Sequence, residues 1–203
     1  MTNLRAIILG CSLKRSPASS SSELLGRQVL AALAEREVDG EFIRIVDHDV
    51  SFGVSIDEGD DDGWPAIRAK ILESQILVIA TPIWMGQPSS VCKMVLERLD
   101  AELAETDGQG RPRVYGKVAA VAVVGNEDGA HHVTAEVFQA LNDVGFTIAA
   151  AASTYWVGEA MKKVDYNKTD PKTDTTGAAT AVLAANTVHL ARLLNDRQYP
   201  APS

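Results

Sequence analysis

Aromatic side chains are scarce in this chain, and positive charge is outweighed by negative charge. Only 5% of the 203 residues are aromatic, and the formal net charge at pH 7 is −8. A net negative charge argues against nucleic acid and against an anionic membrane surface as partners. An anionic ligand would therefore have to be held by local hydrogen-bond donors, because the overall field repels it.

Cysteines and long apolar runs are also rare. Cys11 and Cys92 are the only cysteines, and their spacing gives no Cys-x-x-Cys motif. This usage favours a reducing compartment, gives no basis for a metal site, and leaves both thiols as small buried hydrophobes. The chain has no signal peptide pattern and no apolar run near the ~20 residues of a membrane span. We therefore expect a cytoplasmic protein that does not bind membranes.

Short apolar segments alternate with segments of helical periodicity, which is the pattern of a parallel α/β sheet. We expect one flavodoxin-like domain over residues 1–203. It would be a three-layer sandwich whose parallel sheet has five strands in the order 2-1-3-4-5, with helices on both faces. Strands are predicted at residues 5–9, 41–46, 76–80, 118–124 and 146–152, and helices at 23–33, 65–73, 91–99, 131–144 and after 176.

Three loops follow the carboxyl ends of the first, third and fourth predicted strands, where a sheet of this order binds its ligand. Loop 10–22 is rich in hydroxyls and leads into a helix, whose N-terminal N–H groups and dipole favour phosphate. Loop 81–88 carries Trp84 and Met85, two large apolar side chains that a flat ligand would cover. Loop 125–132 has two glycines, which allow the backbone to approach a planar ring.

Each of these loops also has an ordinary interpretation as a capped helix start or a strand end. Together they favour a ligand with a phosphate tail and a flat polar ring, which describes FMN. Other nucleotides are disfavoured, because Gly-x-Gly-x-x-Gly does not follow the first strand and no Gly-x-x-x-x-Gly-Lys-[Ser/Thr] motif occurs.

Three segments resemble the NADPH-dependent FMN reductase branch of the flavodoxin-like superfamily. They are Thr-Pro-Ile-Trp-Met-Gly-Gln-Pro at 81–88, Gly-Cys-Ser-Leu-Lys at 10–14, and Lys93-x-x-x-Glu97-Arg98. The resemblance covers roughly residues 4–152 and the last helix. It departs from the family pattern after Ser12, where Leu-Lys-Arg replaces the usual x-Arg.

The resemblance implies an FMN site made of three groups of residues. The phosphate group is Ser12, Lys14, Ser20, Ser21 and Ser22; the ring wall is Pro82, Ile83, Trp84, Met85 and Gly86; the ring edge is Gly125, Asn126, Asp128 and Gly129, with His131 beside it. Whether Lys14 or Arg15 contacts phosphate stays open. His131 is either a partner of the flavin carbonyls or substrate, or an ordinary polar residue in the first helical turn.

The resemblance further implies an oxidoreductase that passes hydride from NADPH or NADH, through tightly bound FMN, to a small-molecule acceptor such as a quinone or flavin. Because the flavin carries the reactive chemistry, no catalytic side chain is expected. The alternative is an FMN-binding electron carrier that does not itself turn over NAD(P)H.

A long loop is predicted at residues 153–176, before the last helix. It contains Tyr155, Trp156 and Tyr166, and three aromatic side chains in a polar segment need burial. They could be buried on the protein's own core or on a neighbouring subunit. We favour a subunit interface, and hence a homodimer or homotetramer.

Overall fold

A six-stranded sheet forms the centre of the molecule in a computed structural model, which describes residues 3–159, 162–169 and 174–201. Its principal strands are parallel and lie in the order β2-β1-β3-β5-β6, so the predicted order of five strands is confirmed. A further short strand, β4, pairs antiparallel with the end of β3. The strands are β1 Leu4–Gly10, β2 Val38–Arg44, β3 Ile76–Trp84, β4 Gln87–Pro88, β5 Val118–Gly125 and β6 Thr147–Val157.

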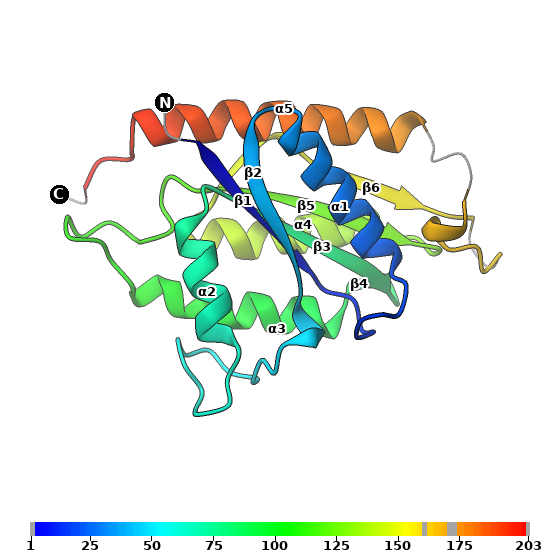
Figure 1. The fold of residues 1–203 in the computed structure, drawn as a ribbon, viewed down its shortest axis with the longest axis horizontal. Coiled ribbons are helices and arrows are strands. Elements are labelled where there is room, and N and C mark those ends of the chain that lie inside the picture. The colour runs from blue at the N-terminus through cyan, green and yellow to red at the C-terminus, as the bar shows by residue number, and fades with distance from the viewer. Residues whose placement is uncertain (1–2, 160–161, 170–173, 202–203) are drawn as a thin grey trace.

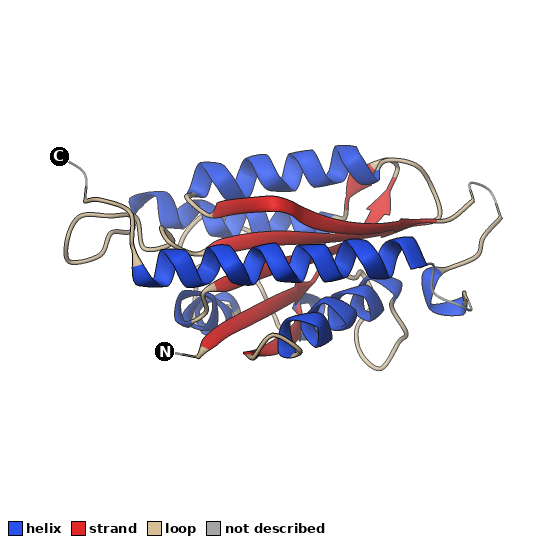
Figure 2. Ribbon diagram, turned by 90° about the horizontal axis from the view of Figure 1, so that it is seen from above, coloured by secondary structure: helices blue, strands red, loops and turns tan. Residues whose placement is uncertain are grey.

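Helices cover both faces of this sheet, as predicted (Figures 1 and 2). The helices are α1 Ser21–Ala34, α2 Trp64–Glu73, α3 Ser90–Leu99, α4 Ala130–Val144 and α5 Asp174–Asp196, with short 3-10 turns η1 Ile45–Asp47, η2 Asp100–Ala104 and η3 Tyr166–Lys168. α1 and α5 pack on one face, and α2, α3 and α4 pack on the other. Each face of the sheet has its own apolar core. Among the described residues, no helix is long and apolar enough to cross a membrane.

The carboxyl ends of β3, β5 and β6 point toward one end of the molecule, opposite both chain termini (Figure 1). β1 runs parallel to β3, so the loop after β1 reaches the same end. Central parallel strands must be apolar on both faces, and β5 is buried along its whole length. Its rigid end therefore gives the loops that follow these strands a fixed base.

Several predicted strand boundaries are wrong. β3 ends at Trp84 instead of residue 80. β2 begins at Val38, where it pairs with Leu4, and it ends at Arg44 instead of residue 46. Asp39 and Gly40 are exposed on this edge strand, so the start of β2 has the composition of a turn. The last strand continues to Val157 instead of ending at residue 152.

The extension of β6 shortens the predicted loop 153–176, of which residues 160–161 and 170–173 lie outside the described residues. Trp156 and Tyr166 are buried in the core beneath α1 and α5, with ring centroids 5.3 Å apart. Placing these two aromatics at a subunit interface was therefore wrong, because the chain's own core covers them. Tyr155 points outward and is 39% exposed.

A buried ion pair holds the acidic segment that precedes α2. Arg98 Nη2 lies 2.7 Å from Asp62 Oδ2, and both side chains are fully buried. Arg98 also donates to the carbonyls of Ser51 and Ile56. Burial would raise the pKa of Asp62, but three backbone N–H donors and Arg98 outweigh it and lower that pKa. The carboxylate therefore stays charged inside the fold.

We expect Arg98→Met to lower the free energy of unfolding by about 3–5 kcal/mol, because it leaves the Asp62 carboxylate buried without its cation. Urea denaturation followed by circular dichroism measures this change. Arg5→Met is the control, since Arg5 forms an exposed ion pair with Glu73 at 3.2 Å, and such a pair contributes at most about 1 kcal/mol. Equal losses in the two variants would contradict the role assigned to Arg98.

Candidate functional site

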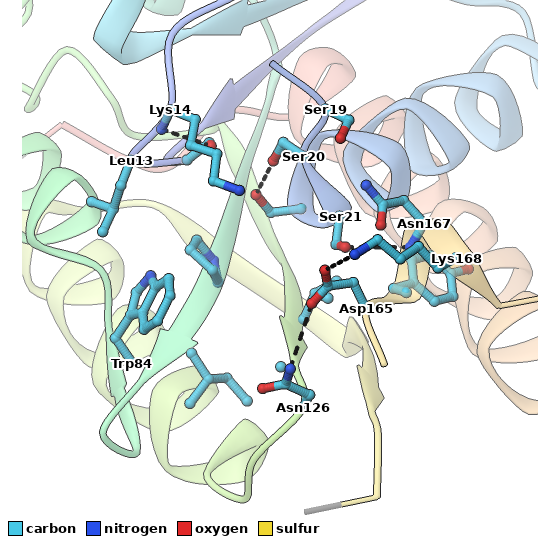
Figure 3. Close-up of a pocket in the computed structure, with 17 residues that line it drawn as sticks. Leu13, Lys14, Ser19, Ser20, Ser21, Trp84, Asn126, Asp165, Asn167 and Lys168 are labelled. Carbon is cyan, nitrogen blue, oxygen red and sulfur yellow. Dashed lines mark hydrogen bonds and ion pairs between the residues drawn. The ribbon is translucent and has the colours of Figure 1, made fainter. Parts of the chain in front are cut away.

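A pocket of about 280 Å³ lies at the carboxyl end of the sheet (Figure 3). Four segments build it: the loop after β1 with the start of α1, the end of β3, the end of β5, and the η3 segment. The lining residues are Ser12, Leu13, Lys14, Ser19, Ser20, Ser21, Ser22, Pro82, Ile83, Trp84, Val124, Gly125, Asn126, Asp165, Tyr166, Asn167 and Lys168.

One end of the pocket is formed by loop 10–22, here called the serine loop, and by the first turn of α1. Ser20 is the N-cap of that helix, and its Oγ accepts a hydrogen bond from the N–H of Glu23 at 3.3 Å. The Oγ atoms of Ser20 and Ser22 are 3.0 Å apart, so one hydroxyl donates to the other. First-turn N–H groups of a helix have no helical acceptor, and with serine hydroxyls beside them they favour an anion.

The buried side chain of Arg44 holds this loop in place. Its Nη1 donates to the carbonyls of Lys14 at 3.1 Å and Ala18 at 2.8 Å, and its Nη2 pairs with Glu23 on α1. Burial would raise the pKa of Glu23, but hydrogen bonds from Arg44 and Arg27 lower it. One cation thus connects β2, the serine loop and α1.

The ring wall is the end of a β-hairpin. β3 runs through Trp84, and the turn consists of Met85 and Gly86, with φ of 53° and 73°. Two positive φ angles are typical of the two-residue hairpin turn that matches strand twist. Trp84 lines the pocket and is 53% exposed, whereas Met85 is 92% exposed and lies outside the lining.

Loop 125–132 after β5, here called the ring-edge loop, packs against this hairpin turn. The N–H of Met85 donates to Glu127 Oε1 at 3.0 Å. A Cβ on Gly129 would lie 2.9 Å from the Cα of Gly86, so the two backbones touch. His131 does not line the pocket, and its Nε2 is 3.1 Å from the hydroxyl of Tyr155.

The pocket therefore gathers the predicted phosphate residues and part of the ring wall and ring edge. Brought together are Ser12, Lys14, Ser20, Ser21, Ser22, Pro82, Ile83, Trp84, Gly125 and Asn126; outside the lining are Met85, Gly86, Asp128, Gly129 and His131. Between the two basic candidates, Lys14 lines the pocket. Arg15 instead pairs with Asp49 at 3.0 Å on the exposed surface.

The residues of the wall facing Trp84 were not among the site residues predicted from the sequence. Asp165, Tyr166, Asn167 and Lys168 form this wall (Figure 3). The long loop before the last helix and its aromatic Tyr166 were the signals of it, and no periodicity indicated which other residues would turn inward. Leu13, Ser19, Val124 and Arg44 were missed as well.

The thiol beside the serine loop is inert. Cys11 is fully buried, and a hydrogen bond with Cys92, together with burial, raises its pKa well above the ordinary value. A protonated, enclosed thiol is neither a nucleophile nor a metal ligand. The interpretation of Cys11 as a small buried hydrophobe is confirmed.

The sheet order and the pocket at its carboxyl end define a flavodoxin-like protein. The chain belongs to the NADPH-dependent FMN reductase family, whose sequence profile matches residues 5–162. It is therefore a member of a family of flavin-dependent oxidoreductases.

Individual relatives agree with this assignment. The chain is 34% identical to 8-demethyl-8-aminoriboflavin-5'-phosphate synthase of Streptomyces davaonensis, over 97% of this chain and 80% of the relative. The crystal structure of RosB with bound 8-demethyl-8-formylriboflavin-5'-phosphate has a TM-score of 0.89 and 32% identity, covering 97% and 82% of the two chains. An archaeal flavodoxin, at a TM-score of 0.59 and 10% identity over 93% and 99%, shares the fold.

A further relative is much longer than this chain. It is the divalent metal cation transporter MntH of Mycobacterium bovis, 35% identical over 94% of this chain. The chain spans only 29% of that relative's length.

The pocket residues fit FMN. The serine hydroxyls and the start of α1 suit a phosphate, and the half-exposed indole of Trp84 suits one side of a planar ring. A Cβ on Gly125 would lie 2.7 Å from Ile83 Cδ1, so a glycine is needed where the ring-edge loop begins. The side-chain oxygen of Asn167 is buried without a hydrogen-bond partner, so it lacks the donor that a buried acceptor usually has.

We expect Arg44→Lys to weaken FMN binding about tenfold, because a single ammonium cannot replace the forked donor that holds two loop carbonyls and Glu23. Titration of the flavin-free protein with FMN, followed by fluorescence, measures the dissociation constant. Arg27→Lys is the matched control, since Arg27 pairs with Glu23 at 2.7 Å but is not among the residues that touch the loop. Unchanged affinity in Arg44→Lys would show that the serine loop keeps its shape unaided.

We expect Gly129→Ala to weaken FMN binding more than Gly59→Ala. Both glycines have nearly the same φ, +124° and +126°, so both variants carry similar backbone strain. Only the Cβ at 129 would meet another backbone, that of Gly86, whereas nothing lies within 4 Å at 59. Equal dissociation constants for the two variants would mean that the hairpin turn and the ring-edge loop can separate without disturbing the pocket.

Proposed function

We propose that this chain oxidises NADPH or NADH and passes the electrons, through FMN, to a small-molecule acceptor such as a quinone or a flavin. The observation that carries the proposal is the arrangement of the pocket, with a hydroxyl-rich anion site at one end and a half-exposed indole along the ring wall. Membership of the NADPH-dependent FMN reductase family supports the choice of donor.

The lining residues bind and orient more than they react. Among the described residues that line the pocket, Lys14, Asp165, Tyr166 and Lys168 are the titratable side chains, and none is a histidine or a cysteine. Burial raises the pKa of Tyr166, which keeps its phenol protonated. When bound, FMN supplies the hydride-accepting chemistry, so the protein needs no catalytic acid or nucleophile.

We expect the FMN-loaded protein to lose its visible flavin absorbance when mixed anaerobically with NADPH or NADH in a stopped-flow instrument.

Trp84→Ala should weaken FMN binding, measured by fluorescence titration, by up to about tenfold, because a ring contact of roughly 0.5–1.5 kcal/mol is lost. Phe52→Ala is the control, since Phe52 is 78% exposed and does not line the pocket.

If neither donor bleaches the bound flavin, the proposed reductase activity is wrong. Tight FMN binding without reduction by either nucleotide would then support the alternative, an electron carrier reduced by another protein.

A second candidate function is the chemical modification of a flavin 5′-phosphate that enters the pocket as substrate. It is favoured by the similarity to the Streptomyces davaonensis synthase, which extends over 97% of this chain and so beyond the family-matched residues. Mass spectrometry of the flavin recovered after incubation separates the two candidates. An unchanged mass after many turnovers of NAD(P)H supports the reductase.

Assembly as a homodimer or homotetramer and a cytoplasmic location stay predictions. Fewer aromatic side chains support an oligomer than the sequence indicated, because Trp156 and Tyr166 are covered by the chain's own core. Tyr155 and Met85 are exposed large side chains that a second subunit could cover.

A further inference from the structure

The wall facing Trp84, residues Asp165–Lys168, lies outside the residues matched by the family profile, which ends at 162. The family assignment therefore does not explain what this wall contributes. It runs beside the pocket from the ring-edge loop to the serine loop (Figure 3). At one end, Asn126 Nδ2 donates to Asp165 Oδ1 at 3.5 Å, and at the other, the N–H of Asn167 donates to Ser21 Oγ at 3.3 Å.

The wall is anchored to the body of the protein. Tyr166 is 1% exposed, packs against Trp156, and donates its hydroxyl to Gln28 Oε1 on α1 at 2.8 Å. Within the wall, the N–H of Lys168 donates to the carbonyl of Asp165 at 2.9 Å. Because Gln28 and Trp156 hold Tyr166 in place, the residues on either side of it line the pocket before any ligand binds.

Two side chains of this wall have binding capacity that the protein itself leaves unused. Asn167 Oδ1 is buried without a hydrogen-bond donor, which is rare for a buried acceptor and requires an explanation. Lys168 Nζ is 3.0 Å from Asp165 Oδ2, but their side chains are 68% and 46% exposed. An ion pair so exposed is weak, so Lys168 can exchange it for a stronger charge-assisted contact.

The chemistry of these two side chains matches the tail of a flavin mononucleotide. Its ribityl chain carries hydroxyl donors, which suit the amide oxygen of Asn167 beside Ser21. Its phosphate carries a double negative charge near neutral pH, which suits a mobile ammonium group. The protein has a net charge of −8, so this attraction has to be local; among the described residues that line the pocket, Lys14 and Lys168 are the cations.

We propose that the wall Asp165–Lys168 is the specificity element that makes this pocket select a flavin 5′-phosphate over the unphosphorylated flavin. Lys168 leaves Asp165 and pairs with the phosphate, while the Asn167 side chain turns its unpaired oxygen toward the pocket and accepts a hydrogen bond from a ribityl hydroxyl. Asp165 keeps its contact with Asn126 and remains at the ring-edge end. The proposal rests on FMN as the ligand of the proposed function, but not on which nucleotide reduces it.

The test is a fluorescence titration of flavin-free protein with FMN and, separately, with riboflavin. Lys168→Gln should weaken FMN binding about tenfold or more, because a charge-assisted contact is lost, and leave riboflavin binding unchanged. Asn167→Ala should weaken both ligands to a similar extent, because both carry the ribityl chain. The FMN preference of the wild type should fall with added salt more steeply than that of Lys168→Gln.

Lys162→Gln is the matched control. Lys162 lies in the same connection and forms an exposed ion pair with Glu159 at 2.7 Å, but it does not line the pocket. This variant should bind both flavins as the wild type does. Lys168 is itself exposed, so Lys168→Gln is expected to fold, and circular dichroism confirms this before titration.

The proposal is overturned if Lys168→Gln keeps the wild-type preference for FMN over riboflavin. These binding measurements use no NAD(P)H, so they fail independently of the reductase activity. Wild-type protein that is not reduced by either donor but loses its phosphate preference in Lys168→Gln would refute the reductase and retain the specificity element. Wild-type protein that binds neither flavin would refute both.

Discussion

The buried guanidinium of Arg44 is the interaction on which the binding pocket depends. It connects the end of β2 to the carbonyls of Lys14 and Ala18 and to Glu23 on α1. A loop built from serines has few apolar side chains with which to pack, so its conformation has to come from polar contacts of this kind. The hydroxyls and N–H groups that would meet a phosphate are in this way oriented before the ligand arrives, which lowers the ordering cost of binding.

The opposite wall is organised by apolar contact instead. Tyr166 inserts beneath α1 and α5 and packs on Trp156, so a stretch of polar residues is held against the pocket by one buried ring. The serine loop and this wall meet through Ser21 and Asn167. The pocket thus has one side set by hydrogen bonds and another set by the core.

The same pocket is compatible with a flavin that remains as cofactor and with a flavin that is altered and released. A fold hosts many functions, and function has to be argued from the site. Here the site supplies binding and orientation, with Trp84 on the open side and a protonated Tyr166 on the closed one. The chemistry therefore depends on how long the flavin stays and on which second reactant reaches it.

The sequence by itself determined the strands, the helices and the hydroxyl-rich loop before α1, because those features follow from local patterns. Apolar runs such as Ile76–Ala80 mark buried parallel strands, and Ser20 lies three residues before Glu23 as a helix cap requires. Only the tertiary structure decided the wall at 165–168, the burial of Tyr166 and the role of Arg44. Tyr166 and its partner Gln28 are 138 positions apart. Contacts of that kind leave no periodicity in the sequence, since they arise when distant segments pack on the same face of the sheet.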